Sequence, residues 1–167
     1  MKTKLKPYMC YLAGMQRGSE VGSAVGITTS IDAIEEKFIE LCIKRLLIPP
    51  NRIIIEERGG ARHVYFYHSL IYRRLKEINE KKTRIFIRDS DLSRGYISGI
   101  FDANGHIGRN SISIRGMDAG DELILDRLGV HTLHGKILNI SQFITLIKGC
   151  SVLFEHTHLP GNERDPR

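Results

Sequence analysis

Three polar side chains that could bind a divalent cation stand at the ends of two similar segments of the chain. Ser19 and Glu20 follow Tyr-Leu-Ala-Gly-Met-Gln-Arg-Gly at residues 11–18. Asn104 follows Tyr-Ile-Ser-Gly-Ile-Phe-Asp-Ala at residues 96–103. Carboxylate and amide oxygens are ligands of hard cations such as Mg²⁺. If the two ends lie side by side, a cation held between them could activate water for a hydrolysis.

Small residues in both segments indicate how the two ends would be brought together. Each segment predicts a short helix with small residues along one face: Ala13, Gly14 and Gly18 in the first, and Ser98, Gly99 and Ala103 in the second. Two faces without bulky side chains could touch backbone to backbone. Gly14 and Gly99 are 85 residues apart, about half of the chain, so the pattern predicts an internal repeat.

The order of the predicted elements agrees with a repeat and with an α+β fold. Residues 1–88 predict a helix from Pro7 to about Gly18, a short strand near residues 20–21, a strand at 24–29, a helix from about residue 30, a hairpin of strands 52–58 and 61–68, and a helix at 69–82. Residues 89–167 predict a shortened copy, with a helix capped by Asp91 or Ser93, a turn at 106–109, a strand at 110–115, a helix at 117–128, a strand region at 132–140, a helix at 141–148 and a disordered tail from Pro160.

The charge of the chain is unevenly distributed. The net charge is +6, but residues 1–88 carry +8 and residues 89–167 carry −2. A basic half favours a polyanionic partner such as nucleic acid, and a surface that only keeps the protein soluble is the alternative. No apolar run is long enough for a membrane span and no signal-peptide core follows the basic N-terminus, so we expect no membrane partner and a cytoplasmic location. Cys10, Cys42 and Cys150 form no close pair and are expected to be buried, reduced thiols.

The two segments resemble the motif of the LAGLIDADG homing endonucleases. Leu12-Ala13-Gly14 matches the start of the motif, and residues 97–105 match all of it, with serine for alanine and Asn104 for the eighth-position acid. The likeness covers most of residues 8–158, including Phe154-Glu155-His156. It implies two pseudo-symmetric repeats, two packed central helices and a concave saddle of antiparallel strands over the major groove of double-stranded DNA. The internal repeat predicts a monomer, because a homodimer that used one segment would leave the other glycine face exposed.

The resemblance also implies a cleavage site, from which this sequence departs. Family members cleave both strands with Mg²⁺ held by the eighth-position acid of each motif, and these positions are Ser19 and Asn104 here. Neither side chain is anionic. The nearest acid is Glu20, one residue after the eighth position of the first motif. Ser19, Glu20 and Asn104 are thus the candidate catalytic residues, with Glu20 and Asn104 as candidate metal ligands. We expect cleavage to be weak or lost, and Mg²⁺ to be the cofactor if activity remains; Asp102 is expected to cap a helix or form a salt bridge.

The residues expected to read DNA follow from strand alternation. Period two places polar side chains on one face of the strand at 110–115 and isoleucines on the other, and arginine and serine commonly contact bases and phosphates. The alternative is a solvated outer face of a half-buried strand. Tyr65 and Tyr67 could contact DNA or belong to the core, and we favour the core. The candidates are Arg109, Ser111, Ser113 and Arg115, with Arg52, Arg58, Arg62 and His63 as first-half counterparts.

Other groupings and functions compete with these interpretations. His131, His134, His156, His158 and Cys150 could form a zinc site, although their spacing matches no zinc finger and isolated surface histidines are favoured. The basic residues of the helix predicted at 69–82 are interpreted as a solvated face, with phosphate contact second; they are Arg73, Arg74, Lys76, Lys81 and Lys82. The alternatives to a binding protein with little cleavage are an active endonuclease that uses Glu20, an RNA-binding intron maturase and a DNA-binding regulator.

Overall fold

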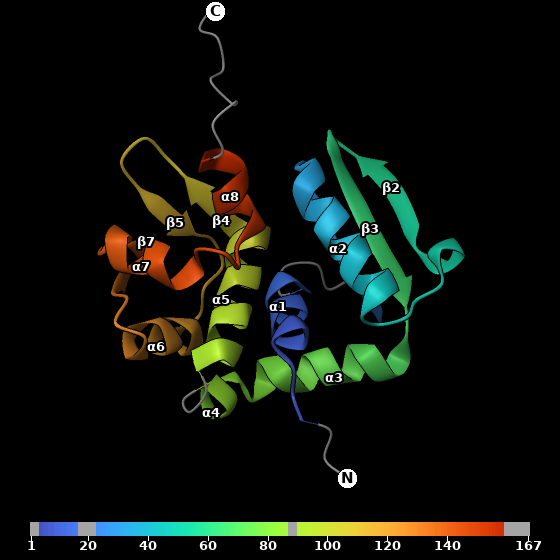
Figure 1. Cartoon of the computed structure of the whole chain (residues 1–167), viewed down its shortest axis with the longest axis horizontal. Helices are drawn as coiled ribbons and strands as arrows, with labels where there is room; N and C mark the ends of the chain where they lie inside the picture. The colour runs from blue at the N-terminus through green and yellow to red at the C-terminus, as the bar shows by residue number, and fades with distance from the viewer. Residues whose placement is uncertain (1–3, 17–22, 87–89, 159–167) are drawn as a thin grey trace, which may run out of the picture.

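The computed structural model describes residues 4–16, 23–86 and 90–158, and its first half combines helices with an antiparallel sheet (Figure 1). Pro7 occupies the first turn of the first helix, where a missing N–H has no cost. Gly59 and Gly60 both have positive φ angles, as a two-residue hairpin turn requires. The first-half elements are α1 (Pro7–Met15), β1 (Ala24–Thr29), α2 (Asp32–Lys44), the 3₁₀ turn η2 (Pro50–Arg52), β2 (Ile54–Arg58), β3 (Ala61–Tyr67), α3 (Ser69–Glu80) and α4 (Lys82–Phe86).

The second half repeats this combination with shorter strands. Its elements are α5 (Ser90–Asn104), β4 (Gly105–Ile107), β5 (Ile112–Ile114), α6 (Ala119–Arg127), β6 (Thr132–Leu133), β7 (Lys136–Ile137), α7 (Ile140–Ile147) and α8 (Val152–His158). Asp118 and Asp121 form a capping box that begins α6. The expected α+β class is confirmed. Among the described residues, no helix is both long and apolar enough to cross a membrane.

The helices α1 and α5 lie side by side at the centre of the molecule, between the two sheets (Figure 1). A Cβ atom on Gly14 would collide with the Tyr96 carbonyl oxygen, and one on Gly99 would collide with that of Tyr11. Gly95, which the sequence analysis did not single out, also lies close to the other helix, because an added Cβ would be 2.7 Å from the Pro7 carbonyl oxygen. The expected pair of packed central helices is confirmed, and the approach is close enough to exclude any side chain at these glycines.

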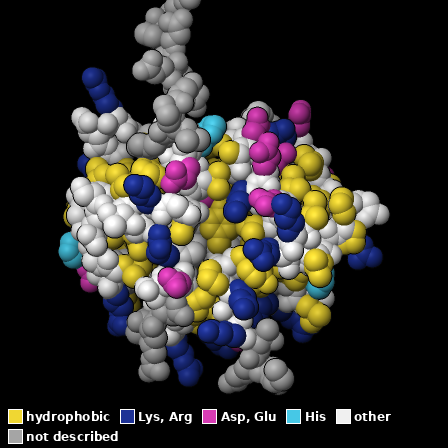
Figure 2. Space-filling model, viewed as in Figure 1, with side chains coloured by type: hydrophobic (Ala, Val, Ile, Leu, Met, Phe, Trp, Pro, Cys, Tyr) yellow, Lys and Arg dark blue, Asp and Glu magenta, His cyan; other side chains and the backbone are white. Residues whose placement is uncertain are grey.

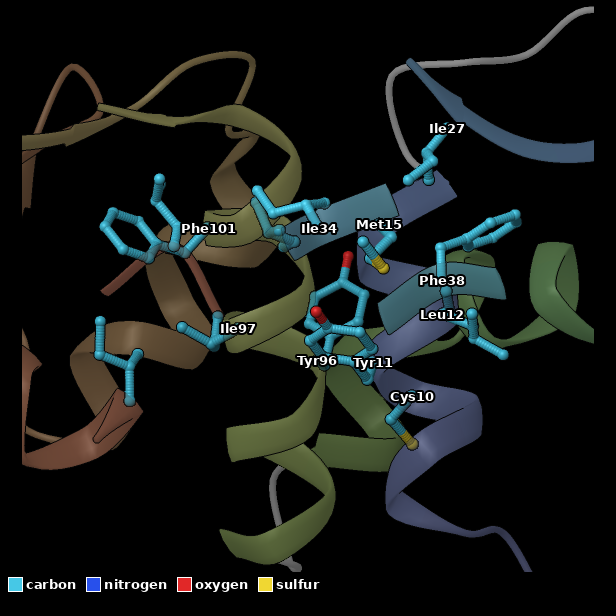
Figure 3. Packing of buried hydrophobic residues seen from close by; sticks show 14 of the residues in the cluster. Cys10, Tyr11, Leu12, Met15, Ile27, Ile34, Phe38, Tyr96, Ile97 and Phe101 are labelled. Carbon is cyan, nitrogen blue, oxygen red and sulfur yellow. The ribbon is translucent and has the colours of Figure 1, made fainter. Parts of the chain in front are cut away.

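The apolar side chains of the two central helices point into separate parts of one core. Ile97 and Phe101 lie on the second-half side of α5, whereas Leu12 lies on the first-half side of α1 near Phe38 of α2 (Figure 3). All four side chains are buried. Burial of this kind contributes about 1.5–3 kcal/mol for each large apolar side chain. The two helices therefore lie at the centre of one apolar core, with one part of that core in each half.

Each half contains an antiparallel sheet. The first sheet has the order β1-β3-β2 and the second has the order β4-β5-β7-β6. In the first sheet, Val25, Ile27, Val64 and Phe66 are buried on one face, and α2 lies against this face. In the second sheet, Ile112 and Ile114 are buried, as the alternation of residues 110–115 predicted. Each sheet therefore has one face in the core and a second face with mostly polar or aromatic side chains.

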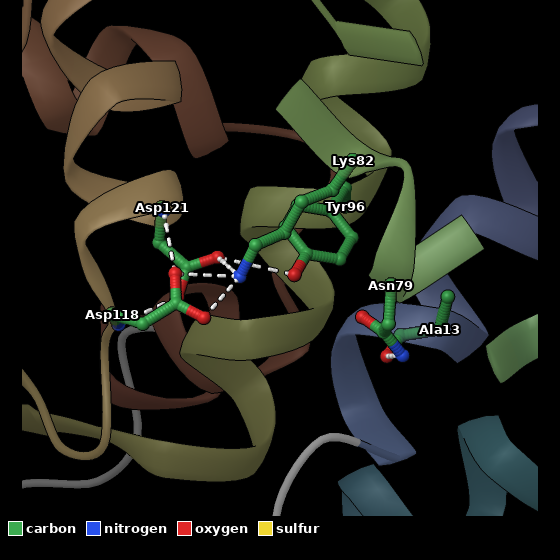
Figure 4. Close-up of polar contacts among 6 residues, drawn as sticks. All are labelled: Ala13, Asn79, Lys82, Tyr96, Asp118 and Asp121. Carbon is green, nitrogen blue, oxygen red and sulfur yellow. Dashed lines mark hydrogen bonds and ion pairs between the residues drawn. The ribbon is translucent and has the colours of Figure 1, made fainter. Parts of the chain in front are cut away.

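A buried lysine joins the two halves beside the central helices. Lys82 in α4 contacts both oxygens of Asp118 at 2.6 Å and Oδ1 of Asp121 at 2.8 Å (Figure 4). Tyr96 of α5 donates to the same Asp121 oxygen at 3.1 Å. Nearby, Asn79 of α3 donates to the Ala13 carbonyl at 3.0 Å, which satisfies an acceptor in the last turn of α1. The interpretation of Lys82 as part of a solvated basic face is therefore wrong.

Several element boundaries differ from those expected. The strand expected at 110–115 is limited to Ile112–Ile114, and β4 occupies part of the expected turn at 106–109. The region 132–140 is a tight hairpin, because His134 and Gly135 both have positive φ angles. α4 and α8 were not expected. The short strand near residues 20–21, the end of the first helix at Gly18 and the tail from Pro160 lie outside the described residues.

The three cysteines are free thiols, as expected. Cys10 and Cys42 are buried, whereas Cys150 is only half-buried, which corrects the expectation for that residue. Burial raises the pKa of the Cys42 thiol to about 12, since a thiolate is poorly solvated in the core.

Candidate nucleic-acid interface

The C-terminal end of α5 places Asn104 at the start of the second sheet. The Asn104 carbonyl accepts a hydrogen bond from the Arg115 backbone N–H at 3.0 Å, which fixes the end of α5 against the end of β5. α1 ends at Met15, and Gln16 continues it with a 3₁₀ turn. Gly18, Ser19 and Glu20 lie outside the described residues, so only the α5 side of the candidate cation site is described.

The donors described at this site do not form a magnesium site by themselves. Asn104 offers a neutral amide oxygen, which attracts a hard cation much less than a carboxylate does. Among residues 4–16, 23–86 and 90–158, no group of three His, Cys, Asp or Glu side chains could hold a metal ion. Asp102, the nearest acid along α5, has its oxygens occupied by other hydrogen bonds. Because Ser19 and Glu20 lie outside the described residues, weak or lost cleavage stays a prediction.

Asp102 caps a helix, but not the helix that contains it. Its carboxylate accepts hydrogen bonds from Ser151 Oγ at 2.5 Å and from the backbone N–H groups of Val152 and Leu153 at 2.8 and 3.0 Å. These N–H groups belong to the first turn of α8, which has no partners for them within the helix. Tyr11 of α1 donates to the same carboxylate at 2.5 Å. Burial raises the pKa of Asp102 even though these four donors favour its charged form. The pKa of Tyr11 is also raised, first by burial and then by the negative charge of Asp102.

The first sheet carries aromatic and charged side chains on the face that α2 does not cover. Strand register places Thr28, Glu56, Arg58, His63, Tyr65 and Tyr67 on this face, which we call the tyrosine face. Tyr67 is 61% exposed, which corrects the preference for tyrosines in the core. Tyr65 donates to Glu56 at 2.9 Å, and Arg58 contacts the same carboxylate at 2.8 Å. These contacts lower the pKa of Glu56, with the Tyr65 hydrogen bond as the largest cause.

Two of the four first-half candidates lie away from the tyrosine face. Arg62 precedes His63 on β3, so its side chain lies on the opposite face, where it forms ion pairs with Asp32 and Glu35 near the start of α2. Arg62 and His63, both candidates for DNA contact, therefore lie on opposite faces of the first sheet. Arg52 lies in η2, before β2 begins. His63 is buried and hydrogen-bonded to Thr28 Oγ1 at 2.8 Å, whereas Arg58 is exposed.

The second sheet has a smaller polar face built around Ser113. Cross-strand register places His106 of β4 and Lys136 of β7 beside it, and Leu133 beside Lys136. We call these four residues the serine face. Of the expected residues, Arg115 is exposed and directly follows β5, whereas Arg109 and Ser111 lie in the loop between β4 and β5. Ser113 is half-buried between its neighbours on the sheet.

Sequence reasoning missed His106 and Lys136 as members of the serine face. Each faces Ser113 across the sheet, because β5 lies between β4 and β7. The Gly135 hairpin was visible in the sequence, but the pairing of β7 with β5 is a long-range contact that no local pattern encodes. Of the histidines considered for zinc, His131 is exposed and contacts Asp126 at 2.9 Å.

Comparison with solved structures supports the fold, whereas comparison of the sequence with known families and proteins finds no match. No protein-family model and no curated protein matches this chain. A variant of the homing endonuclease I-DmoI, in complex with its target DNA in the presence of manganese, has a similar structure with a TM-score of 0.66 and 17% identity, over 84% of this chain and 93% of that chain. I-DmoI with DNA and calcium has a TM-score of 0.62 and 19% identity, over 90% and 88% of the two chains.

The N-terminal LAGLIDADG domain of DUF199/WhiA is also similar, with a TM-score of 0.61 and 14% identity over 86% of this chain and 80% of that chain. At such identities the likeness concerns the fold alone. The expectation from the two glycine-bearing segments is confirmed at this level: the chain has the fold of the LAGLIDADG homing endonucleases.

Proposed function

We propose that this protein binds double-stranded DNA at a specific, long site, as a monomer, with little or no cleavage. The observation that carries the proposal is the pair of antiparallel sheets beside one central helix pair, each with a polar or aromatic face away from the core. An I-DmoI variant with a similar fold was solved in complex with its target DNA. The tyrosine face would contact one part of the duplex and the serine face another.

The side chains on the two faces are suited to base and backbone contacts. Lys136 and Arg115 can donate to guanine edges or phosphates, and Ser113 can donate or accept. On the tyrosine face, Arg58 is available as a donor, and Glu56 can accept from the amino group of cytosine. The excess of +8 in residues 1–88 would favour association with a polyanion. A cytoplasmic location forms part of the same proposal.

The proposal of weak or absent cleavage depends on the chemistry of the donors. Metal-assisted hydrolysis needs anionic ligands that concentrate Mg²⁺ and lower the pKa of bound water. Asn104 supplies no charge, and the Asp102 carboxylate already accepts the hydrogen bonds that cap α8. Glu20 is the acid through which activity could remain.

Selection of a binding site from random duplexes, followed by fluorescence anisotropy, tests the proposal. We expect one long consensus site, and a loss of affinity with salt that follows the number of phosphate contacts. Lys136→Ala and Arg115→Ala should each weaken binding by about 1–3 kcal/mol if the residue reads a base, with the loss confined to one position of the site. Arg73→Ala, an exposed position on α3, is the matched control and should change little.

Two results would contradict the proposal. The first is the absence of any duplex binding at low salt. The second is affinity for duplexes that is equal for all sequences and unchanged by Lys136→Ala and Arg115→Ala. Preference for structured RNA over every selected duplex would instead favour the RNA-binding alternative.

A further inference from the structure

A groove with basic walls lies on the helix-covered side of the first sheet. Its volume is about 750 Å³, and it runs between α1, α2 and the link before α8. Figure 2 shows Lys and Arg side chains around an apolar hollow in this part of the molecule. Its lining includes Lys6, Tyr8, Lys37, Leu41, Lys44 and Arg45, which define what we call the basic groove. Because α2 lies on the opposite side of the sheet from the tyrosine face, the groove is separate from the proposed DNA surface.

The cations of the basic groove exceed the acids that could neutralise them. Lys44 contacts Glu40 at 3.1 Å. Within the described part of the chain, the side chains of Lys6, Lys37 and Arg45 have no ion-pair partner. The pKa of Glu40 is lowered, first by the hydrogen bond and charge of Lys44 and then by the charges of Lys37 and Arg45. One carboxylate thus stands among four cations, and the groove attracts further negative charge.

The floor of the groove is apolar and offers little surface for stacking. Pro7 and Tyr8 contribute to it, whereas Leu41 also lines the groove but is only 7% exposed. Tyr11 also lines the groove but is only 6% exposed, and its hydroxyl group is bound to Asp102. Single-stranded nucleic acids are held by successive aromatic rings. Here Tyr8 is the one aromatic ring with substantial exposure among the described lining residues, so the floor suits aliphatic side chains better than bases.

We propose that the basic groove binds an acidic, amphipathic segment of a partner protein. Apolar side chains of that segment would cover Pro7 and Tyr8, and its carboxylates would face the cations Lys6, Lys37 and Arg45. This arrangement combines an apolar anchor with charge complementarity at the rim. The site would allow the protein to hold a protein partner while its sheets hold DNA.

The test measures binding of a fluorescein-labelled helical peptide of glutamate and leucine, with leucines along one face. A second peptide has the same composition with its leucines distributed around the helix, and a labelled DNA single strand is the third probe. The double variant Lys37→Glu, Arg45→Glu reverses two groove charges. Its matched control is Arg73→Glu, Lys76→Glu, which reverses two exposed charges of α3. Thermal unfolding of each variant reports whether it is folded.

We expect the amphipathic peptide to bind better than its rearranged counterpart, and the groove variant to weaken that binding about tenfold. The α3 control should retain most of the affinity, and Tyr8→Ser should reduce it without a change in charge. Both charge variants should still bind the selected duplex, which separates this inference from the proposed function.

Three results would overturn the inference. One is equal binding of the two peptides. Another is equal weakening by the groove variant and the α3 control, which would mean that only net charge matters. The third is evidence of a different occupant, either nucleic acid, shown by tighter binding of the single strand than of the amphipathic peptide, or a second copy, shown by self-association that the groove variant abolishes.

Discussion

The hydroxyl group of Tyr11 on α1 donates a hydrogen bond to Asp102 on α5 at 2.5 Å, across the contact between the two halves. The same carboxylate caps α8, the last described helix. One buried acid thus connects the first helix of the chain, the central helix of the second half and the C-terminal helix. α8 also packs against α2, so this connection holds a second-half helix on the first half.

Asp102→Ala should destabilise the protein strongly. The substitution removes four hydrogen bonds and leaves buried donors of Tyr11, Val152 and Leu153 without an acceptor, which costs about 2–4 kcal/mol in the free energy of unfolding. Chemical denaturation measures this loss. Tyr11→Phe removes one donor and leaves the cap intact, so its effect should be clearly smaller; an equal effect would contradict the capping role.

Gly99→Leu should also destabilise the fold, by about 3 kcal/mol, because a side chain at this position collides with the Tyr11 carbonyl and forces the central helices apart. The matched control is Ala119→Leu, at the exposed first residue of α6, where a larger side chain has space. Thermal unfolding of the two variants compares them. If Gly99→Leu melts like the parent protein, the close backbone contact is wrong.

Lys82→Met should cost about 3–5 kcal/mol, since it removes an ammonium group that contacts the fully buried Asp121 carboxylate. A second change, Asp121→Asn, removes the uncompensated charge. The double variant should therefore recover part of the lost stability. Urea denaturation of the wild type and the three variants, including Asp121→Asn alone, gives the coupling energy; additive effects would show that the two residues do not act as a pair.

Glu56 gives the tyrosine face a dependence on pH. Its pKa is lowered from 4.5 in the folded protein by Tyr65 and Arg58, so its stabilising effect is present above pH 4.5 and is lost as the pH falls through the lower folded value. The wild type should thus be more stable than Glu56→Gln near neutral pH, and the difference should shrink at acid pH. Thermal unfolding between pH 7 and acid pH measures it, and a difference that grows on acidification would contradict the assignment.

Cleavage should be absent or very slow when the selected duplex is incubated with Mg²⁺ or Mn²⁺. The double variant Ser19→Asp, Asn104→Asp supplies an acid at the eighth position of each motif and should raise any cleavage by orders of magnitude, because anionic ligands concentrate the metal. Gel analysis of nicked and linear plasmid distinguishes cuts in one strand from cuts in both. Efficient double-strand cleavage that Glu20→Gln abolishes would show that the shifted acid is active.

The sequence predicted the central features because they are encoded locally. Gly14 and Gly99 stand in recognisable motifs, and the Ile112 and Ile114 alternation marks a buried strand face directly. Arg62 and His63 are adjacent on β3 and therefore lie on opposite faces, but which of them faces α2 depends on packing between elements that no local pattern encodes. The burial of Lys82 was not predicted because the acids with which it forms ion pairs, Asp118 and Asp121, are distant in the sequence. The roles of Ser19 and Glu20, which lie within residues 17–22, are predicted from the sequence alone.

The contact between α1 and α5 has a consequence for the order of events during synthesis. The glycine face of α1 finds its partner only when residues 95–100 have been made, and α8 adds its contact with α2 only near the end of the chain. Until then, the newly made first half exposes a bare stripe of helix backbone and the apolar side chains beside it. Apolar surface that stays exposed until late in synthesis makes a chain vulnerable to aggregation, so production of this protein should depend on chaperones.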